Sequence, residues 1–144
     1  MPKRIVFVCV ENSCRSQIAE AFARQYGGPD VEAYSAGSRP SGQVNPKAIE
    51  SMKELGYDLG THASKGLDDL PSVEFDAAVT MGCGDECPNV RARIRLDWGI
   101  PDPKHLGEEE FRQVRDGIGA KVRELLANLH GDPRKSLDEE IAKT

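Results

Sequence analysis

Residues 5–16 read IVFVCVENSCRS and carry the strongest fold signal in the chain. Ile5 to Cys9 is continuously apolar, as expected of a parallel strand that is covered on both faces. A helical pattern begins at about Ser16, so the intervening loop joins the carboxyl end of a strand to the amino end of a helix. Backbone N–H groups and the helix dipole concentrate positive potential at such a junction. The sequence therefore predicts an anion-binding loop.

Cys9 and Arg15 give this loop its chemistry. A thiol beside a helix amino end and a guanidinium ionises readily, so we expect Cys9 to be a nucleophilic thiolate at neutral pH. Arg15 can hold a tetrahedral oxyanion through two parallel hydrogen bonds. The expected substrate-binding residues are Val10, Glu11, Asn12, Ser13, Cys14, Arg15 and Ser16.

The rest of the chain alternates between strand and helix patterns. Val31 to Ala36 and Phe75 to Met81 are typical of buried strands, and Ala92 to Asp97 alternates apolar and charged residues like a strand nearer an edge. Helices are expected from about Ser16 to Tyr26, from Asn45 to Gly56 and from Phe111 to Leu129. The pattern predicts a small doubly wound α/β domain, with a four-stranded parallel sheet flanked by helices.

Length and composition limit the possible functions. With 144 residues, 38% apolar and 30% charged, the chain suits one compact domain. We assign residues 1–130 to this catalytic domain and residues 131–144 to a charged tail without an assigned function. The net charge of −5 and the dispersed basic residues argue against nucleic acid and membrane partners. No apolar run approaches the roughly 20 residues of a membrane span, and no cleavage-site pattern follows Met1. We expect a cytoplasmic monomer.

The cysteines and histidines show no convincing metal-ligand spacing. The four cysteines are Cys9, Cys14, Cys83 and Cys87, a number that in a reducing compartment indicates catalysis or metal binding. Cys14 is interpreted as a buried structural thiol, with a role as a substitute redox partner left open as the alternative. Cys83 and Cys87 could bind zinc only if other thiols completed the ligand set, so we expect no metal and no other cofactor. The histidines are interpreted as surface or helix-end residues outside the mechanism: His62, His105 and His130.

Several motifs resemble a known superfamily. They are Cys-x5-Arg-Ser after the first strand, Ser35-Ala36-Gly37 after the second, and Asp102-Pro103 late in the chain. Together they resemble the low-molecular-weight tyrosine phosphatase superfamily, which has a flavodoxin-like topology, over roughly residues 4 to 130. Residues 12–20 (NSCRSQIAE) and 79–88 (VTMGCGDECP) are more narrowly similar to the arsenate reductases of that superfamily. Gln17 stands where the phosphatases usually have proline, and the phosphatases lack the later cysteine pair.

The resemblance implies that Cys9 attacks arsenate. Ser16 would donate its hydroxyl to the thiolate, and Arg15 with the loop amides would neutralise the equatorial oxygens. Asn12 is expected to brace the loop with a positive φ angle, which asparagine tolerates better than most residues. Asp102 is the implied general acid that protonates the departing oxygen. Phosphate and sulfate would bind in the same loop as analogues of arsenate.

The resemblance also implies a relay of thiols. Arsenic accepts two electrons, so a second thiol can attack the Cys9 sulfur, form a disulfide and release arsenite. Cys83 is the preferred second thiol, because the glycines on either side of it, Gly82 and Gly84, would permit the necessary backbone movement. Cys87 would then resolve that disulfide. Thioredoxin or a low-molecular-weight thiol such as mycothiol would reduce the resulting Cys83–Cys87 disulfide.

Two other function classes remain open at this point. A small phosphatase acting on phosphotyrosine or a small phosphoester would need only Cys9, Arg15 and Asp102. A non-catalytic oxyanion or arsenic sensor would need the loop and the thiols but not Asp102. Some relatives bind potassium near the loop through an acidic residue, and the apparent counterpart here is Lys65, whose ammonium group would replace the metal.

Overall fold

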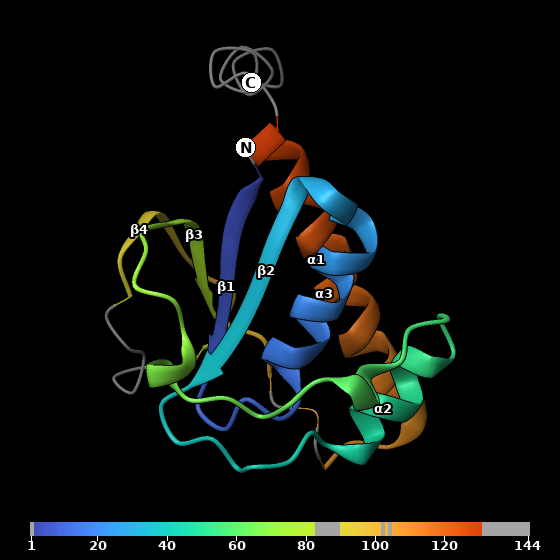
Figure 1. Ribbon diagram of the computed structural model, residues 1–144. Coiled ribbons are helices and arrows are strands. Elements are labelled where there is room, and N and C mark those ends of the chain that lie inside the picture. Colours follow the sequence, from blue (N-terminus) through green and yellow to red (C-terminus); the bar gives the residue numbers. More distant parts are fainter. Residues whose placement is uncertain (1, 83–89, 102, 104, 131–144) are drawn as a thin grey trace.

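The computed structural model describes residues 2–82, 90–101, 103 and 105–130 of the chain. A parallel sheet with the strand order β2-β1-β3-β4 forms the centre of the domain (Figure 1). The strands are β1 (Lys3–Cys9), β2 (Val31–Gly37), β3 (Phe75–Thr80) and β4 (Ala92–Asp97). This is the strand order of a flavodoxin-like doubly wound sheet, so the predicted fold class is confirmed, as is the edge position of β4.

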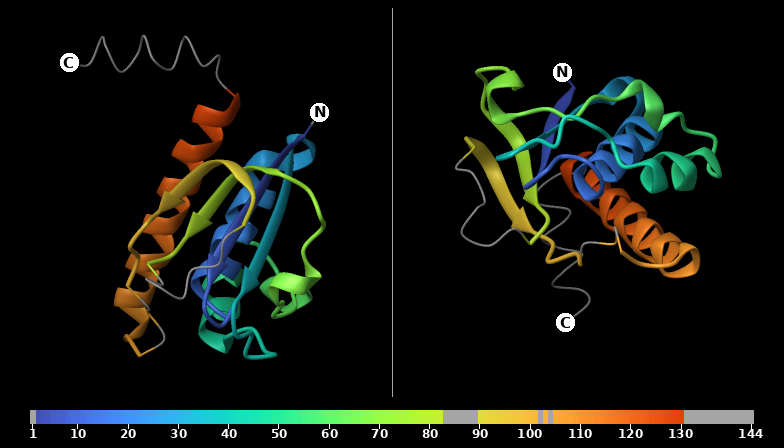
Figure 2. Two further views of the ribbon diagram at one scale, coloured as in Figure 1. Left: turned by 90° about the vertical axis from the view of Figure 1, so that its left-hand side faces the viewer. Right: turned by 90° about the horizontal axis from the view of Figure 1, so that it is seen from below.

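The main helices are α1 (Arg15–Gly27), α2 (Pro46–Lys53) and α3 (Glu108–His130). Figures 1 and 2 show α1 and α3 side by side against one face of the sheet. As predicted, α2 begins after Asn45, whose side chain accepts a hydrogen bond from the Lys47 backbone N–H. It ends earlier than predicted, since a turn leads from Lys53 to Gly56, where φ is +81°. Among the described residues, no helix is both long and apolar enough to span a lipid bilayer.

Both faces of β1 are buried, which explains its uninterrupted apolar sequence. Ile5 and Phe7 belong to the main core cluster, together with Phe22 of α1. Val6 and Val8 belong to a smaller cluster, which the described residues Leu70 and Val73 help to cover. A strand buried on both sides has no solvent-facing position for a polar residue. The same burial holds the end of β1, and therefore Cys9, in a fixed place.

Parallel strands bring their carboxyl ends to one edge of the sheet. Arg15 joins two chain segments at that edge, because its Nη1 donates hydrogen bonds to the carbonyl oxygens of Met81 and Ile100, each at 2.7 Å. Met81 follows β3, and Ile100 follows β4. The loop after β1 therefore meets the chain that leaves the two neighbouring strands. The predicted tail, residues 131–144, lies outside the described residues.

Candidate active site

The loop between β1 and α1 encloses a small cavity. Its volume is about 150 Å³, and its lining residues are Cys9, Val10, Glu11, Ser13, Cys14 and Arg15. All six were predicted from the sequence to bind substrate or to act on it. A cavity of this size is large enough for a small anion.

The backbone of this loop is turned so that its N–H groups face the cavity. Backbone N–H groups of Arg39, Ser41 and Asn45 donate to the carbonyl oxygens of residues 10, 11 and 13 at 2.8–2.9 Å. These carbonyl groups therefore point away from the cavity. A trans peptide holds its C=O and N–H on opposite sides, so the N–H groups of the following residues point inward. This is the arrangement that a tetrahedral oxyanion requires.

The amino end of α1 adds to this cradle. Cys14 precedes the helix without making a side-chain capping hydrogen bond, and the first turn contains no acidic residue. The first N–H groups of a helix need acceptors from outside the helix, and an anion is a favourable acceptor there. The Cys14 side chain is 4% exposed, so its predicted burial is confirmed.

Asn12 and Ser16 lie behind the loop and support it. Asn12 has φ of +49° and is the only non-glycine residue in the described part of the chain with a positive φ, as predicted. Its Nδ2 donates to Ser16 Oγ at 2.9 Å, and Ser16 Oγ lies 2.9 Å from Cys9 Sγ. Both side chains are wholly buried and are not among the residues that line the cavity. They hold the sulfur and the loop in place from the protein side.

Gly37, at the end of β2, makes room for the loop. A β-carbon at this position would lie 2.4 Å from the Val10 carbonyl oxygen and 2.9 Å from the Asn12 nitrogen. Both neighbours are backbone atoms, and the Val10 carbonyl oxygen is held by a hydrogen bond from the Arg39 N–H at 2.8 Å. This close approach explains why the Ser35-Ala36-Gly37 motif ends in glycine.

A charged cluster is buried beneath the loop. Glu20 is 2% exposed and accepts hydrogen bonds from Ser35 Oγ at 2.5 Å, Arg24 Nε at 2.8 Å and Lys65 Nζ at 3.3 Å. Two cations thus compensate one buried carboxylate, which satisfies the requirement that buried charges be paired. Lys65 brings its positive charge to the Glu20 carboxylate, and the replacement of a potassium ion by its ammonium group stays a prediction.

His62 lies at the end of the short 3-10 helix Leu59–Thr61, as its helix-end interpretation predicted, but it does not lie at the surface. Its side chain is 7% exposed, with Nδ1 at 3.0 Å from Gln17 Oε1 and Nε2 at 2.7 Å from Tyr57 Oη. The histidine side chain therefore belongs to the support of the loop. Burial lowers the pKa of His62, against the opposing effect of the nearby Glu20 carboxylate. His105 is exposed, as predicted.

Three predicted catalytic residues lie outside the described residues: Cys83, Cys87 and Asp102. Their assignments remain predictions. The described chain leads toward two of them, because Met81 and Ile100, whose carbonyls bind Arg15, each precede one of these residues by two positions. Gly82 adopts φ of +78°, and its N–H donates to the Asp97 carboxylate at 2.8 Å.

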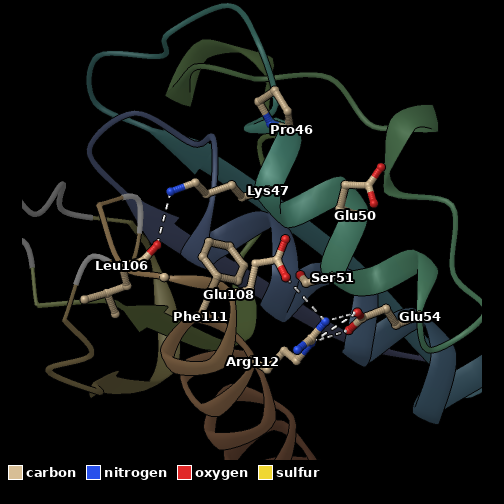
Figure 3. A pocket seen from close by; sticks show the side chains of 10 residues that line it. Pro46, Lys47, Glu50, Ser51, Glu54, Leu106, Glu108, Phe111 and Arg112 are labelled. Carbon is tan, nitrogen blue, oxygen red and sulfur yellow. Dashed lines mark hydrogen bonds and ion pairs between the residues drawn. The ribbon is translucent and has the colours of Figure 1, made fainter.

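A second and larger cavity lies between α2 and the start of α3. Figure 3 shows this cavity, which has a volume of about 480 Å³. Lys47 reaches across it and donates to the Leu106 carbonyl at 3.1 Å, while Arg112 binds Glu54 at 2.8 Å. None of its lining residues belongs to the loop, and no thiol is among them. We therefore place the reactive site at the smaller cavity.

Comparisons with known proteins agree with this assignment. Residues 4–137 match the family described as low molecular weight phosphotyrosine protein phosphatase. The chain belongs to this family. It is 41% identical over 130 residues to arsenate reductase 2 of Staphylococcus saprophyticus, an alignment that covers 88% of this chain and 98% of the relative.

Solved structures place the chain near the arsenate reductases of the family. One is an arsenate reductase in its phosphate-binding state, with a TM-score of 0.80 and 36% identity, covering 88% of this chain and 98% of the other. Another is a thioredoxin-dependent arsenate reductase of Corynebacterium glutamicum, with a TM-score of 0.70 and 32% identity, covering 88% and 61% respectively. The resemblance stated from the sequence motifs is confirmed.

Proposed function

We propose that this protein reduces arsenate to arsenite with Cys9 as the nucleophile, and that it serves in arsenic detoxification. The observation that carries the proposal is the position of the Cys9 sulfur. It lies at the wall of a cavity lined by the loop, 2.9 Å from the Ser16 hydroxyl. The close similarity to arsenate reductases over nearly the whole chain supports arsenate as the oxyanion.

The first step forms a sulfur–arsenic bond. The Cys9 thiolate attacks arsenic, and one arsenate oxygen leaves as water after Asp102 donates a proton to it. Inward N–H groups of the loop and Arg15 stabilise the charge on the remaining oxygens. Ser16 donates its hydroxyl to the sulfur and so favours its ionised form.

The second step reduces arsenic. The Cys83 thiolate attacks the Cys9 sulfur, the sulfur–arsenic bond breaks, and its electron pair stays on arsenic, which leaves as arsenite. Cys87 then attacks the Cys83 sulfur and releases Cys9 as a thiolate. The final Cys83–Cys87 disulfide takes two electrons from thioredoxin or from a low-molecular-weight thiol. The thioredoxin-dependent relative from Corynebacterium glutamicum supports thioredoxin as the donor. We propose a cytoplasmic location and a monomeric state.

The phosphatase alternative is less favoured. It uses Cys9, Arg15 and Asp102, but it assigns no role to Cys83 and Cys87. The family as a whole includes phosphotyrosine phosphatases, so hydrolysis of a phosphoester is the natural second activity to measure. A non-catalytic sensor would bind arsenate without producing arsenite.

The test combines substrate and electron donor. Purified protein receives arsenate with thioredoxin, thioredoxin reductase and NADPH, or with small thiols, and arsenite is measured. Cys9→Ser is expected to abolish turnover, whereas Cys83→Ser and Cys87→Ser should block reduction but spare any phosphatase activity. Full arsenate turnover by the Cys83 and Cys87 variants with thioredoxin would reject the relay.

A further inference from the structure

A continuous row of hydrogen bonds leads from Tyr57 to the Cys9 sulfur. The successive contacts are Tyr57 Oη to His62 Nε2 at 2.7 Å, His62 Nδ1 to Gln17 Oε1 at 3.0 Å, Gln17 Nε2 to Asn12 Oδ1 at 2.8 Å, Asn12 Nδ2 to Ser16 Oγ at 2.9 Å and Ser16 Oγ to Cys9 Sγ at 2.9 Å. The three middle side chains of Gln17, Asn12 and Ser16 are completely buried. Groups in such an environment depend on one another, because water cannot replace a lost partner.

The surroundings fix the orientation of both amide groups in this row. Gln17 Nε2 lies within 2.8–3.1 Å of three oxygens, two from Asn12 and the carbonyl of Ala63, so this atom must be the donor nitrogen. The Gln17 oxygen then faces His62. Asn12 Oδ1 receives the backbone N–H of Lys65 at 2.6 Å, which identifies it as the oxygen. The Asn12 nitrogen therefore faces Ser16.

These orientations determine the protonation of His62. A carbonyl oxygen only accepts hydrogen bonds, so His62 Nδ1 must carry the proton that points at Gln17. In the neutral ring Nε2 is then an acceptor, and the Tyr57 hydroxyl donates to it. Ser16 Oγ accepts from Asn12, and because a thiolate has no proton to give, the Ser16 hydroxyl is the donor when Cys9 is ionised. Every donor in the row consequently points toward the sulfur.

The charged groups around His62 are consistent with a neutral ring. The Glu20 carboxylate lies 3.4 Å from Nδ1, with Lys65 and Arg24 as cations and Asp58 as a further anion nearby. Burial lowers the pKa of His62, and burial raises the pKa of Tyr57. Both shifts favour a neutral imidazole that accepts a hydrogen bond from a neutral phenol.

We propose that His62 is a positioning residue for Cys9: the Nδ1–H tautomer of His62 acts through Gln17, Asn12 and Ser16, and the Tyr57 hydroxyl supports this tautomer by donating to Nε2. The inference rests on the role of Cys9 as nucleophile in the proposed function. It adds His62 and Tyr57 to the residues that support this nucleophile. His62 touches no reacting atom. It holds the Gln17 amide in the orientation that makes Ser16 a hydrogen-bond donor to the thiolate, and so keeps Cys9 ionised.

Two measurements test the proposed role of His62. Nitrogen-15 NMR of His62 distinguishes a protonated Nδ1 from a protonated Nε2. The rate at which iodoacetamide alkylates Cys9, followed against pH, reports the ionised fraction of this thiol. The alkylation uses a Cys83→Ser/Cys87→Ser background. The tryptic peptide 5–15 contains both Cys9 and Cys14, and its fragmentation by tandem mass spectrometry identifies which of the two thiols is alkylated. Neither measurement requires arsenate turnover, so a failure of the proposed function is distinguishable from a failure of this inference.

The variants remove one element of the row at a time. His62→Leu removes the donor to Gln17 and is expected to raise the pH midpoint of Cys9 alkylation by about one unit, a tenfold loss of thiolate well below the midpoint. His62→Gln keeps one donor and one acceptor and should restore most of the shift. Tyr57→Phe keeps the ring and should raise the midpoint by a few tenths of a unit. The matched control is Tyr34→Phe, because the Tyr34 hydroxyl bonds only Glu32 among the described residues, away from this row.

The outcomes separate support from rejection. The inference is supported if Nδ1 is protonated in the unmodified protein and if the pH midpoint of Cys9 alkylation rises most in His62→Leu, less in Tyr57→Phe and not in Tyr34→Phe. An Nε2-protonated ring, or a midpoint that is the same in Tyr57→Phe and Tyr34→Phe, overturns the inference even if His62→Leu fails to fold. A His62→Leu protein that folds and keeps the midpoint of the unmodified protein overturns it as well.

Discussion

Two regions of this molecule use polar side chains to fix a helix, and they do so by opposite means. Behind the anion loop, the row from His62 to Ser16 consists of neutral, buried groups that support the amino end of α1. Between α2 and α3, Glu54 binds Arg112 at 2.8 Å and Arg115 at 2.7 Å, and the Glu54 and Arg112 side chains are each 40% exposed. The row behind the loop consists of directional hydrogen bonds between neutral groups. The second region pairs the half-exposed Glu54 with the half-exposed Arg112 and with Arg115, whose side chain is 7% exposed.

The difference indicates which contacts matter for chemistry. Removing one partner from a buried neutral pair leaves the other partner unsatisfied at a cost of about 1–3 kcal/mol. An exposed ion pair contributes about 0–1 kcal/mol, since water and salt replace the lost partner. The loop should therefore respond sharply to single substitutions, whereas the α2–α3 contact should tolerate them. Substitutions in both regions test this difference in sensitivity.

Gly37→Ala should have the largest effect. The added β-carbon would meet backbone atoms at 2.4 Å and 2.9 Å, so the loop or β2 must shift. We expect the free energy of unfolding to fall by about 3 kcal/mol and phosphate binding to be lost, as measured by urea denaturation and calorimetry. Gly117→Ala is the control, because its β-carbon meets nothing within 4 Å in α3. That change should stabilise the protein by about 0.5–1 kcal/mol. Equal stability of both variants would contradict the close approach at residue 37.

Ser16→Ala removes the one hydroxyl that joins the row to Cys9. The thiolate loses a donor at 2.9 Å, and Asn12 Nδ2 loses its acceptor. We expect kcat/KM for arsenate to fall about 100-fold, the usual effect of losing one stabilising donor. Ser41→Ala, beside the same loop but with an exposed hydroxyl, should keep full activity. An unchanged kcat/KM in Ser16→Ala would mean that the sulfur does not depend on this hydrogen bond.

The stability of the protein should depend on His62 in mildly acidic solution. Burial keeps the folded-state pKa of His62 below its ordinary value of 6.5, so the unfolded chain takes up the proton first. Stability from this residue is complete above about pH 6.5 and is lost as pH falls through the lower folded value, with a slope of at most about 1.4 kcal/mol per pH unit. Urea denaturation from pH 7 to pH 5 should show that the free energy of unfolding depends less steeply on pH in His62→Gln than in the unmodified protein. His105→Gln, at an exposed position, should keep the original slope.

Glu54→Gln should have the smallest effect. Hydrogen bonds from Arg112 and Arg115 lower the pKa of Glu54 from 4.5 to about 2. Its stabilising contribution is present above pH 4.5 and disappears as the carboxylate is protonated toward pH 2. The thermal midpoint of the variant should be slightly lower than normal at pH 7, and the difference should vanish in acid. Arsenate turnover should not change. A large loss of activity would show that the α2–α3 contact influences the loop.

The sequence was sufficient for the fold and for the loop. The apolar run from Ile5 to Cys9, followed by a helical pattern, favoured a strand buried on both sides and a strand-to-helix junction after it. The start of α2 after Asn45 followed from similar local signals, and the positive φ of Asn12 followed from the family resemblance together with the tolerance of asparagine for this conformation. These features depend on residues that are close in sequence, so local patterns contain the necessary information.

The support of the loop could not be predicted in this way. His62 meets Gln17 across 45 positions, and Lys65 meets Glu20 across 45 as well. Nothing in the local sequence around His62 distinguishes a buried, hydrogen-bonded ring from an exposed one. The only available signal was Gln17 itself, a polar residue near the start of an amphipathic helix, which needs partners if it is buried. The resemblance to arsenate reductases pointed to Gln17 but not to what it binds.

The uncapped start of α1 links folding to ligand concentration. The helix begins at Arg15 with no side-chain cap and no acidic residue in its first turn. A bound tetrahedral anion would take the place of that cap, so ligand and helix stabilise each other by mass action. Phosphate in a buffer should raise the melting temperature, and depletion of oxyanions should make the first turn of α1 the earliest part of the helix to exchange its amide hydrogens with solvent.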